Sequence, residues 1–243
     1  MCTIAFIPKN GQYYFASLRD ESPKRPAALV PAFIYANNTR CLAPVDPLGG
    51  GTWVGINEYR CVIILMNGGC KNHAKKSKYA VSRGAIVKKL LADTRPVIGW
   101  NLMNLINVEP FTLIVWADEQ LFQLVWNGRK KQTLHLSKTE THIWSSATLY
   151  SYKAQNYRAN LFKNWIVRQS IISQLSLLDF FKMYDDPLNG FFINRNGLVK
   201  TLSYTFMATT IDNTVIVSYH DCISSQYHTS KISILTNNQL CLC

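Results

Sequence analysis

Acidic residues are scarce in this chain of 243 residues, where 14 Asp and Glu stand against 26 Lys and Arg. The formal net charge is therefore +12, although only 16% of the residues are charged. A content of 48% hydrophobic residues excludes an intrinsically disordered chain and is sufficient for a full core. The excess of positive charge favours an anionic partner.

The sequence also lacks long apolar runs and an ordered set of cysteines. No apolar run reaches the ~18 residues of a membrane-spanning helix, and the first residues do not have the layout of a secretory signal. The 7 cysteines are an odd number spread along the chain, which is typical of reduced thiols. We therefore expect a cytoplasmic protein without a transmembrane segment.

Motifs for nucleotides, metals and nucleic acids are missing as well. There is no G-x-G-x-x-G, Walker or H-E-x-x-H pattern. The two tight basic clusters, Lys75-Lys76-Ser77-Lys78 and Arg129-Lys130-Lys131, contain no interleaved aromatic residues, so we expect no nucleic-acid partner. The terminal Cys241-Leu242-Cys243 matches no zinc pattern, and we expect neither a metal nor another cofactor.

A strong hairpin signal stands at the start of the chain. Asn10-Gly11 separates two apolar segments, and Asn-Gly favours a two-residue turn because both positions need a positive φ. With this turn, Cys2 faces Arg19 on the second strand, and Asp20 follows directly. Opposed residues project to the same face of a sheet, so the hairpin places a thiol beside a guanidinium.

Hairpin-connected strands alternate with grouped helices along the rest of the chain. We predict strands over residues 52–56, 60–66, 111–117, 121–126, 132–136, 191–193, 198–207, 214–219 and 231–235, and helices over 83–92, 100–105, 153–174 and 177–183. Residues 22–48 are predicted to form a long irregular connection, and such loops are usually functional. The order is typical of an antiparallel α+β fold in layers. Since no composition shift divides the chain, we predict a single domain over residues 1–243.

Three side chains are candidates for chemistry. Removal of the initiator Met would give Cys2 a thiol nucleophile and an α-amine that titrates near pH ~8, while the alternative is an ordinary small residue that starts a strand. Asn67 ends a buried strand before two glycines, as either a turn residue or an amide donor. His73 lies in a basic loop, as either a solvated residue or a ligand.

Short motifs extend over nearly the whole chain in a recognisable order. They are Met1-Cys2-Thr3, Arg19-Asp20-Glu21, Gly50-Gly51-Thr52-Trp53-Val54-Gly55 and Asn67-Gly68, followed by residues 79–84, 109–112, 144–150 and 200–205. Together they resemble the NRDE family, which is the family of the transport-and-Golgi-organisation protein, and the later motifs resemble its bacterial branch. This resemblance implies the four-layer αββα sandwich of N-terminal-nucleophile hydrolases, with antiparallel sheets.

The resemblance also implies roles for individual residues. In the choloylglycine and penicillin acylases, which share that fold, an N-terminal Cys is the nucleophile and its α-amine is the base. By position, Cys2 matches this nucleophile, while Arg19 and Asp20 match a pair on the second strand of those enzymes. Asn67 matches a donor to the oxyanion.

A ligand is also expected to contact Trp53, Ser145, Ser146 and Lys200. Trp53 belongs to one of the shared motifs. Three parts of the chain differ from the family pattern. Leu18 stands where the family signature has Asn, and Ser145-Ser146 occupy a segment where relatives commonly have Asn. Lys200 stands where some relatives have Arg, and it cannot make the planar bidentate contact of a guanidinium.

Two functions follow as hypotheses. The first is hydrolysis of a non-peptide C–N bond in an anionic small molecule, with Cys2 as nucleophile and no cofactor. The alternative is a carrier of haem or an acyl lipid without catalytic activity, since eukaryotic relatives are linked to the handling of such ligands. Haem needs an axial ligand such as His, and His73 is the candidate.

Overall fold

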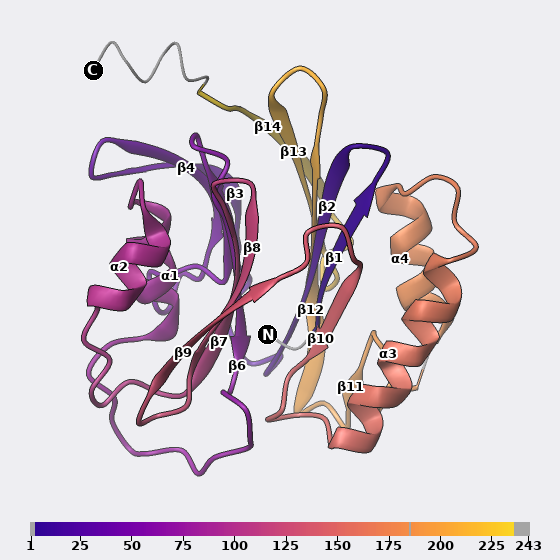
Figure 1. The fold of residues 1–243 in the computed structure, drawn as a ribbon. Coiled ribbons are helices and arrows are strands. Elements are labelled where there is room, and N and C mark those ends of the chain that lie inside the picture. Colours follow the sequence, from indigo (N-terminus) through magenta and orange to yellow (C-terminus); the bar gives the residue numbers. More distant parts are fainter. Residues whose placement is uncertain (1–2, 185, 236–243) are drawn as a thin grey trace.

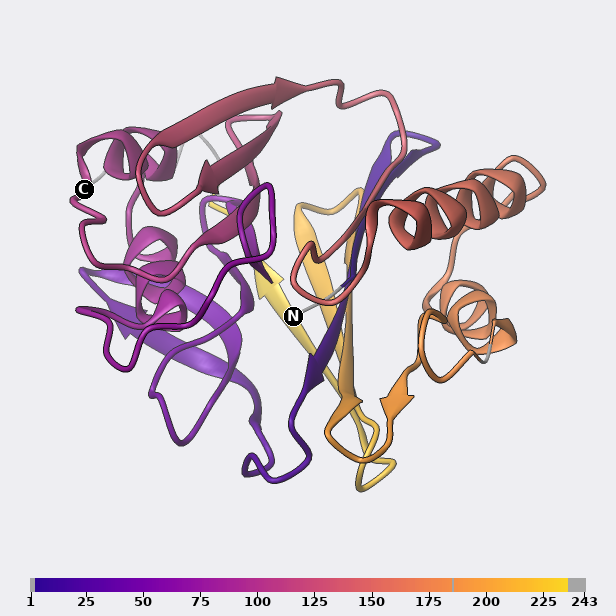
Figure 2. The ribbon, with the colours of Figure 1, turned by 90° about the horizontal axis from the view of Figure 1, so that it is seen from below.

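Two antiparallel sheets lie face to face, and a pair of helices covers the outer face of each (Figure 1). The computed structural model describes residues 3–184 and 186–235. The view from below in Figure 2 shows the same succession of layers: helices, sheet, sheet and helices. This arrangement confirms the four-layer αββα sandwich predicted from the sequence.

The first sheet contains the initial hairpin and the last strands of the chain. Its hydrogen-bonded order is β10 (His142–Ser145), β1 (Thr3–Lys9), β2 (Gln12–Glu21), β12 (Val199–Thr209), β13 (Thr214–Asp221) and β14 (Tyr227–Ser233), with β11 (Asn194–Arg195) paired to β12. The helices α3 (Tyr152–Ile166) and α4 (Gln174–Met183) cover its outer face (Figure 1). Leu18, Phe162, Phe180 and Phe206 belong to the apolar cluster between this sheet and its helices.

The second sheet is built from consecutive strands. They are β3 (Leu29–Ala36), β4 (Thr39–Val45), β5 (Val54–Asn57), β6 (Val62–Asn67), β7 (Phe111–Ala117), β8 (Gln120–Trp126) and β9 (Lys131–Leu136). The helices α1 (Arg83–Leu91) and α2 (Pro96–Leu102) cover its outer face (Figure 1). A larger apolar cluster includes Ile4, Phe15, Ile64 and Trp116, and it fills the space between the sheets.

The predicted first hairpin is confirmed. Asn10 and Gly11 form the turn with φ values of 52° and 74°. Strand pairing runs from Lys9 opposite Gln12 to Thr3 opposite Leu18, which is the predicted register. The predicted pairing of Cys2 with Arg19 lies outside the described residues.

The prediction of an irregular connection over residues 22–48 is wrong. This segment contains the hairpin of β3 and β4, whose turn residues Asn37 and Asn38 have φ values of 49° and 59°. Asn tolerates the left-handed region almost as Gly does, so Asn-Asn takes the place of Asn-Gly. Pro31 lies within β3, which is an edge strand where a missing N–H costs no ladder bond.

Some predicted boundaries are also wrong. The second helix begins at Pro96, not at residue 100, because Pro fits the first position of a helix. The third helix ends at Ile166 instead of near residue 174, and its buried side chains are Arg158 and Phe162, while Tyr157 of the predicted apolar stripe is exposed. Residues 191–193 form no strand, and β11 follows them.

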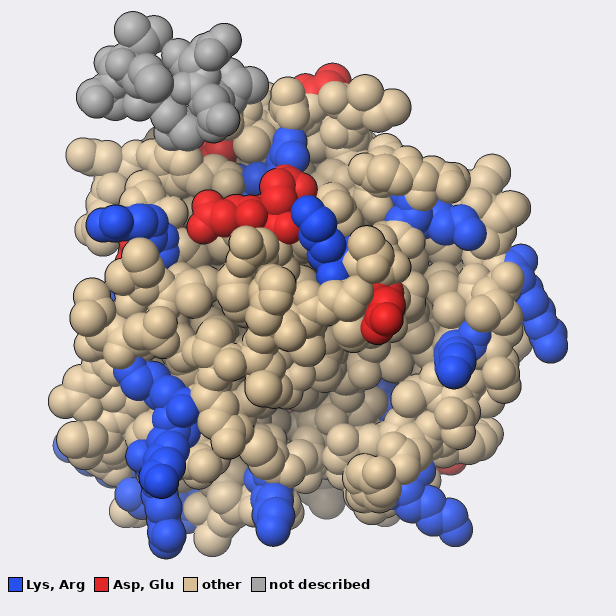
Figure 3. Space-filling model, in the orientation of Figure 1, with Lys and Arg blue, Asp and Glu red and all other residues tan. Residues whose placement is uncertain are grey.

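Basic side chains are dispersed over the surface. On the face in Figure 3, Lys and Arg lie mostly around the periphery, and the fewer Asp and Glu lie nearer the upper centre. Among the described residues, none of the helices combines the length and the apolar character that a membrane crossing requires. Within the same residues, no cluster of three or more His, Cys, Asp or Glu could hold a metal ion.

Candidate active site

The end of β2 sends neighbouring side chains to opposite faces of the first sheet, because side chains alternate along a strand. Arg19 projects toward the second sheet, where its guanidinium carbon lies 4.4 Å from the centroid of the Trp53 ring. One nitrogen of Arg19 lies 3.8 Å from Asp46 Oδ2. Burial lowers the pKa of the Arg19 guanidinium, and the charge of Asp46 counteracts this effect. Arg19 is thus a buried cation fixed by stacking and by an ion pair.

Asp20 is a buried carboxylate on the other face. Thr201 lies opposite it on β12 and donates its hydroxyl to Asp20 Oδ1 at 2.6 Å. The hydroxyl of Tyr150 donates to Asp20 Oδ2 at 3.4 Å. These contacts orient the carboxylate at the open end of the first hairpin.

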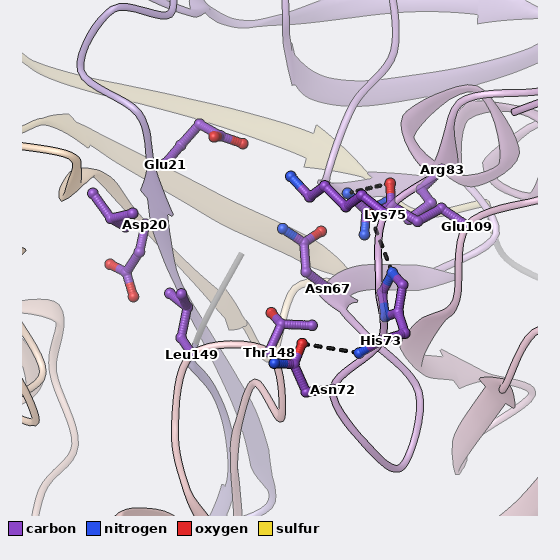
Figure 4. Close-up of a pocket in the computed structure, with 11 residues that line it drawn as sticks. Asp20, Glu21, Asn67, Asn72, His73, Lys75, Arg83, Glu109, Thr148 and Leu149 are labelled. Atoms are coloured by element: carbon purple, nitrogen blue, oxygen red, sulfur yellow. Dashed lines mark hydrogen bonds and ion pairs between the residues drawn. The ribbon is translucent and has the colours of Figure 1, made fainter. Parts of the chain in front are cut away.

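A cavity opens beside Asp20 between the ends of several strands. Figure 4 shows Asp20 and Glu21 on one wall, Arg83 and Glu109 on the opposite side, and Asn67 between them. The other lining residues are Asn72, His73, Lys75, Thr148, Leu149 and Val199. The cavity therefore brings together two of the residues predicted for catalysis, Asp20 and Asn67.

Asn67 ends β6, and neighbouring groups hold its backbone. Its carbonyl accepts a hydrogen bond from Ser146 Oγ at 2.8 Å. Gly68 has a φ of +84°, and an added Cβ would approach Thr148 Cγ2 to 2.7 Å, so only glycine fits this turn. The side-chain amide of Asn67 forms no hydrogen bond with another described residue. The backbone of Asn67 is therefore held in place, and its side-chain amide is a donor that is open to the cavity.

The two serines predicted to contact a ligand are buried and hydrogen-bonded within the protein. Ser145 Oγ accepts from Arg158 Nε at 2.8 Å. Ser146 Oγ contacts the Asn67 carbonyl and, at 2.8 Å, the hydroxyl of Thr148. Through Ser146 the segment after β10 in the first sheet is joined to the end of β6 in the second, next to the cavity.

Of the predicted ligand contacts His73 and Lys200, only His73 lines the cavity. Lys200 lies opposite Glu21 in the register of β12 with β2, while its neighbour Val199 lines the cavity. His73 lines the cavity and is not a solvated loop residue. Its Nε2 lies 3.3 Å from Glu109 Oε1, and Glu109 Oε2 lies 3.1 Å from an Arg83 nitrogen.

A second cavity adjoins the first and shares Glu21, Asn67 and Arg83 with it. It is also lined by Arg19, Arg25, Asp46, Gly49, Gly51, Thr52, Trp53, Leu65, Ser82 and Gly84. Burial disfavours ionisation of the Asp46 carboxyl, but the hydrogen bond and charge of Arg25 outweigh this effect and hold its pKa below the ordinary value. This cavity combines arginine cations with ionised carboxylates and includes the predicted Trp53.

Comparison with known proteins gives the family of the chain. Residues 1–239 match the profile of the family described as Transport and Golgi organisation 2. The chain belongs to this family. No curated protein matches the chain by sequence.

Two of the solved structures that are similar to this member of the Transport and Golgi organisation 2 family are described as hydrolysing enzymes. An N-acylethanolamine-hydrolyzing acid amidase ortholog from Caenorhabditis elegans superimposes with a TM-score of 0.59 at 12% identity, over 85% of this chain and 92% of that one. A variant of the conjugated bile acid hydrolase from Clostridium perfringens gives 0.53 at 10% identity, over 94% of this chain and 92% of that one. The chain therefore has the N-terminal-nucleophile hydrolase fold.

Sequence reasoning missed three residues that surround the site in this family member. Thr201 and Tyr150 hold Asp20. Both lie within motifs that resemble the family, but a threonine in a strand and a tyrosine before a helix are common, and neither was assigned a role. Arg158 is fully buried on α3. It precedes the buried Phe162 by one helical turn, and a charged residue at that spacing on an apolar face was the available signal.

Proposed function

We propose that this chain is an N-terminal-cysteine amidohydrolase that cleaves a non-peptide C–N bond in an anionic small molecule. The observation that carries the proposal is the register of the first hairpin, in which Thr3 faces Leu18. This register places Thr3, which is bonded to Cys2, next to the end of β2, where Arg19 and Asp20 lie.

The reaction uses the thiol and the α-amine of Cys2 after loss of Met1. The thiolate attacks the substrate carbonyl carbon to form a C–S bond, while the α-amine holds the thiol proton. The side-chain amide of Asn67 donates to the oxyanion. The C–N bond then breaks, and the leaving amine takes the proton from the α-ammonium. Water attacks the resulting thioester, which releases the acid and restores the thiol.

Arg19 and Asp20 have supporting roles in this scheme. The buried guanidinium of Arg19 favours the thiolate over the thiol, since a nearby positive charge lowers a thiol pKa. Asp20 has a fixed carboxylate that orients the α-ammonium. The names of the two similar structures support a substrate with an acyl group on nitrogen, since one is called an amidase and the other acts on conjugated bile acids.

Positive groups in the second cavity support an anionic substrate. Its lining combines three guanidinium groups, of Arg19, Arg25 and Arg83, with two carboxylates, of Glu21 and Asp46. In the first cavity, Lys75 and Arg83 lie opposite Glu21, but the carboxylates there number three. The net charge of +12 raises the local concentration of anions around the whole molecule. A substrate carboxylate beyond the scissile bond fits this distribution better than a cationic group.

The decisive experiment measures alkylation of the mature protein by iodoacetamide, with peptide mass spectrometry to assign each thiol. We expect Cys2 to react faster than Cys70, an exposed thiol that serves as the internal reference. Burial raises the pKa of Cys41 to about 11 and of Cys222 to about 12, so these thiols should stay largely unlabelled. A Cys2 rate no higher than that of Cys70 would contradict the proposal.

Processing of the N-terminus gives an independent test. The α-amine of Cys2 is a base only when Met1 is absent and the amine is unacetylated, since an amide nitrogen is not basic. Intact mass of the protein isolated from its native cells should therefore show loss of Met without acetylation. A retained Met1 or an acetylated Cys2 would remove the base from the mechanism.

Binding of haem or an acyl lipid remains the second candidate, and the position of His73 in the cavity wall favours it. Because Nε2 of His73 already contacts Glu109, this nitrogen would have to leave that carboxylate to reach iron. Titration with haem should produce a saturable shift of the Soret band that is lost in His73→Ala and kept in His135→Ala, which changes a histidine outside both cavities. No saturable shift would reject haem binding.

A further inference from the structure

Thr3, at the start of β1, is hydrogen-bonded to a buried arginine of α3. Arg158 lies on the face of α3 that packs on the first sheet and is 1% exposed. One of its terminal nitrogens donates to Thr3 Oγ1, and Nε donates to Ser145 Oγ at 2.8 Å. Thr3 and Ser145 face each other in the register of β1 with β10. A single guanidinium therefore joins the start of one strand to the end of its neighbour.

The rest of the guanidinium is also engaged. Its other terminal nitrogen donates to the carbonyls of Asn189, at 3.0 Å, and Gly190. The rings of Tyr150 and Phe191 lie 4.1 Å and 4.3 Å from the guanidinium carbon. These contacts fix the plane of the group, because each nitrogen donates at least one hydrogen bond and the two rings pack against it.

A fully buried cation is costly unless its surroundings compensate it. A leucine or methionine would serve packing against Phe191 and Tyr150 without that cost. The guanidinium instead directs two hydrogen bonds at the ends of β1 and β10, where a hydrocarbon chain offers none. Tyr150 extends the same network to Asp20 through its hydroxyl.

We propose that Arg158 is a positioning residue, which fixes the amino end of β1 and thereby the reacting end of Cys2 relative to Arg19 and Asp20. This inference rests on the proposed function for its catalytic meaning. Arg158 acts through Thr3, to which Cys2 is covalently bonded. It takes no part in bond making.

Two substitutions separate the geometry of Arg158 from its charge. Arg158→Met fills similar space without donors, and Arg158→Lys keeps the charge but loses the planar fork. Arg195→Gln is the matched control, because Arg195 also stacks on Tyr150, at 5.0 Å, but bonds to the Leu188 carbonyl and not to Thr3. All variants are first compared by circular dichroism, to establish that they fold.

The first measurement is the pH profile of Cys2 alkylation. We expect the midpoint in Arg158→Met to rise by about one pH unit, which lowers the thiolate fraction about tenfold near neutral pH. Arg158→Lys should lie between Arg158→Met and the wild type, and Arg195→Gln should match the wild type. A residue that only stabilises the fold would lower the unfolding midpoint and leave this profile unchanged. Superposition of the Arg158→Met and wild-type profiles would therefore overturn the inference.

The second measurement does not depend on catalysis. Hydrogen exchange at the amides of Thr3 and Ile4 should be at least tenfold faster in Arg158→Met than in Arg195→Gln, because the strand end is released. If wild-type Cys2 is unreactive, the proposed function fails, and this comparison still decides whether Arg158 holds β1. Equal exchange in the two variants would show that it does not.

Discussion

At the scale of single residues, the open amide of Asn67 gives the most direct test of catalysis. A donor to the oxyanion stabilises charge that develops only in the transition state, so its removal lowers kcat more than it raises KM. We expect Asn67→Ala to reduce the turnover of an N-acyl amide by ~10²–10³-fold. The measurement is steady-state hydrolysis with the amide that the mature enzyme cleaves best from a panel with anionic tails.

The matched control for this substitution is Asn72→Ala. Asn72 lines the same cavity, but its side-chain oxygen accepts the backbone N–H of His73. We expect Asn72→Ala to change kcat by less than tenfold, and Asn67→Ala to leave the alkylation rate of Cys2 near the wild-type value. Equal losses of kcat in both variants would contradict an oxyanion role for Asn67.

Buried hydroxyls on β12 provide a paired test of stability. Thr201 donates to Asp20 and accepts the backbone N–H of Ile193 at 2.9 Å. Thr201→Val removes both bonds and leaves that N–H unsatisfied, which costs about 1–3 kcal/mol. Thr205 Oγ1 is buried without a partner among the described residues, so Thr205→Val should be neutral or stabilising. Urea unfolding of both variants checks the prediction, and equal destabilisation would contradict it.

Buried thiols make the free energy of unfolding depend on pH in the alkaline range. The Cys41 thiol donates to the Leu91 carbonyl at 3.4 Å, and burial together with the charge of Glu58 raises its pKa to about 11. The unfolded thiol titrates near ~8.5. Below that pH the thiol is protonated in both the folded and the unfolded protein, and its contribution to stability is complete. Above it the thiol ionises first in the unfolded protein, which favours unfolding. Stability should therefore fall as the pH rises from about 8.5 toward 11.

This dependence is measured by urea midpoints between neutral and alkaline pH. Cys41→Ala should show a shallower decline than the wild type, while Cys70→Ser, which changes an exposed thiol, should keep the wild-type slope. Part of the slope will remain in Cys41→Ala, because burial also raises the pKa of Cys61 and Cys222. An unchanged slope in Cys41→Ala would contradict the prediction.

Individual site residues differ in how far they could be predicted from the sequence. The position of Arg19 and Asp20 at the open end of the first hairpin followed from a local rule, because one Asn-Gly turn sets the register of a whole hairpin. Arg158 could not be assigned in this way, since its contacts with Thr3 and Gly190 depend on how a helix packs over a sheet. His73 was expected in a loop, and only the path of that loop brings it to Glu109.

At the scale of elements, turn chemistry decided which hairpins were predicted. The Asn-Gly turns at residues 10–11 and 127–128 led to correct strands on both sides. The hairpin of β3 and β4 was missed because its turn is Asn-Asn and its first strand contains Pro31. An edge strand with exposed apolar residues shows little alternation, so periodicity could not replace the missing turn signal.

The turn of that hairpin gives a prediction at the same scale. Asn38 has a φ of 59°, a conformation that costs most L-residues roughly 1–2 kcal/mol. Asn38→Ala should therefore lower the free energy of unfolding by about 1 kcal/mol, and Asn38→Gly should raise it slightly. Urea denaturation of the wild type, Asn38→Ala and Asn38→Gly measures their free energies of unfolding. Asn38→Gly being less stable than Asn38→Ala would contradict the assigned turn.

At the scale of the whole molecule, the antiparallel arrangement gathers the site from distant parts of the sequence. The starts of β1 and β12 and the ends of β2 and β10 meet at one end of the first sheet, because neighbouring strands run in opposite directions. The end of β6 in the second sheet reaches the same place, and the hydrogen bond from Ser146 to Asn67 joins the two. The packing of the two sheets, more than any single motif, therefore brings the residues of the cavity together.

The net charge of +12 is a property of the whole molecule. It can be tested by asking whether the site favours an anionic reagent over a neutral one. Iodoacetate and iodoacetamide alkylate thiols by the same chemistry, but only iodoacetate is an anion. Positive potential at the site should raise the ratio of their rates at Cys2 above the ratio for 2-mercaptoethanol, a small thiol with no other charged group. The Debye length falls from ~30 Å at about 0.01 M salt to ~3 Å at about 1 M, so the excess should disappear at high salt. A ratio at Cys2 that equals the 2-mercaptoethanol ratio at low salt would show that carboxylates such as Glu21 and Asp46 cancel the field, and an anionic substrate would then have no electrostatic support.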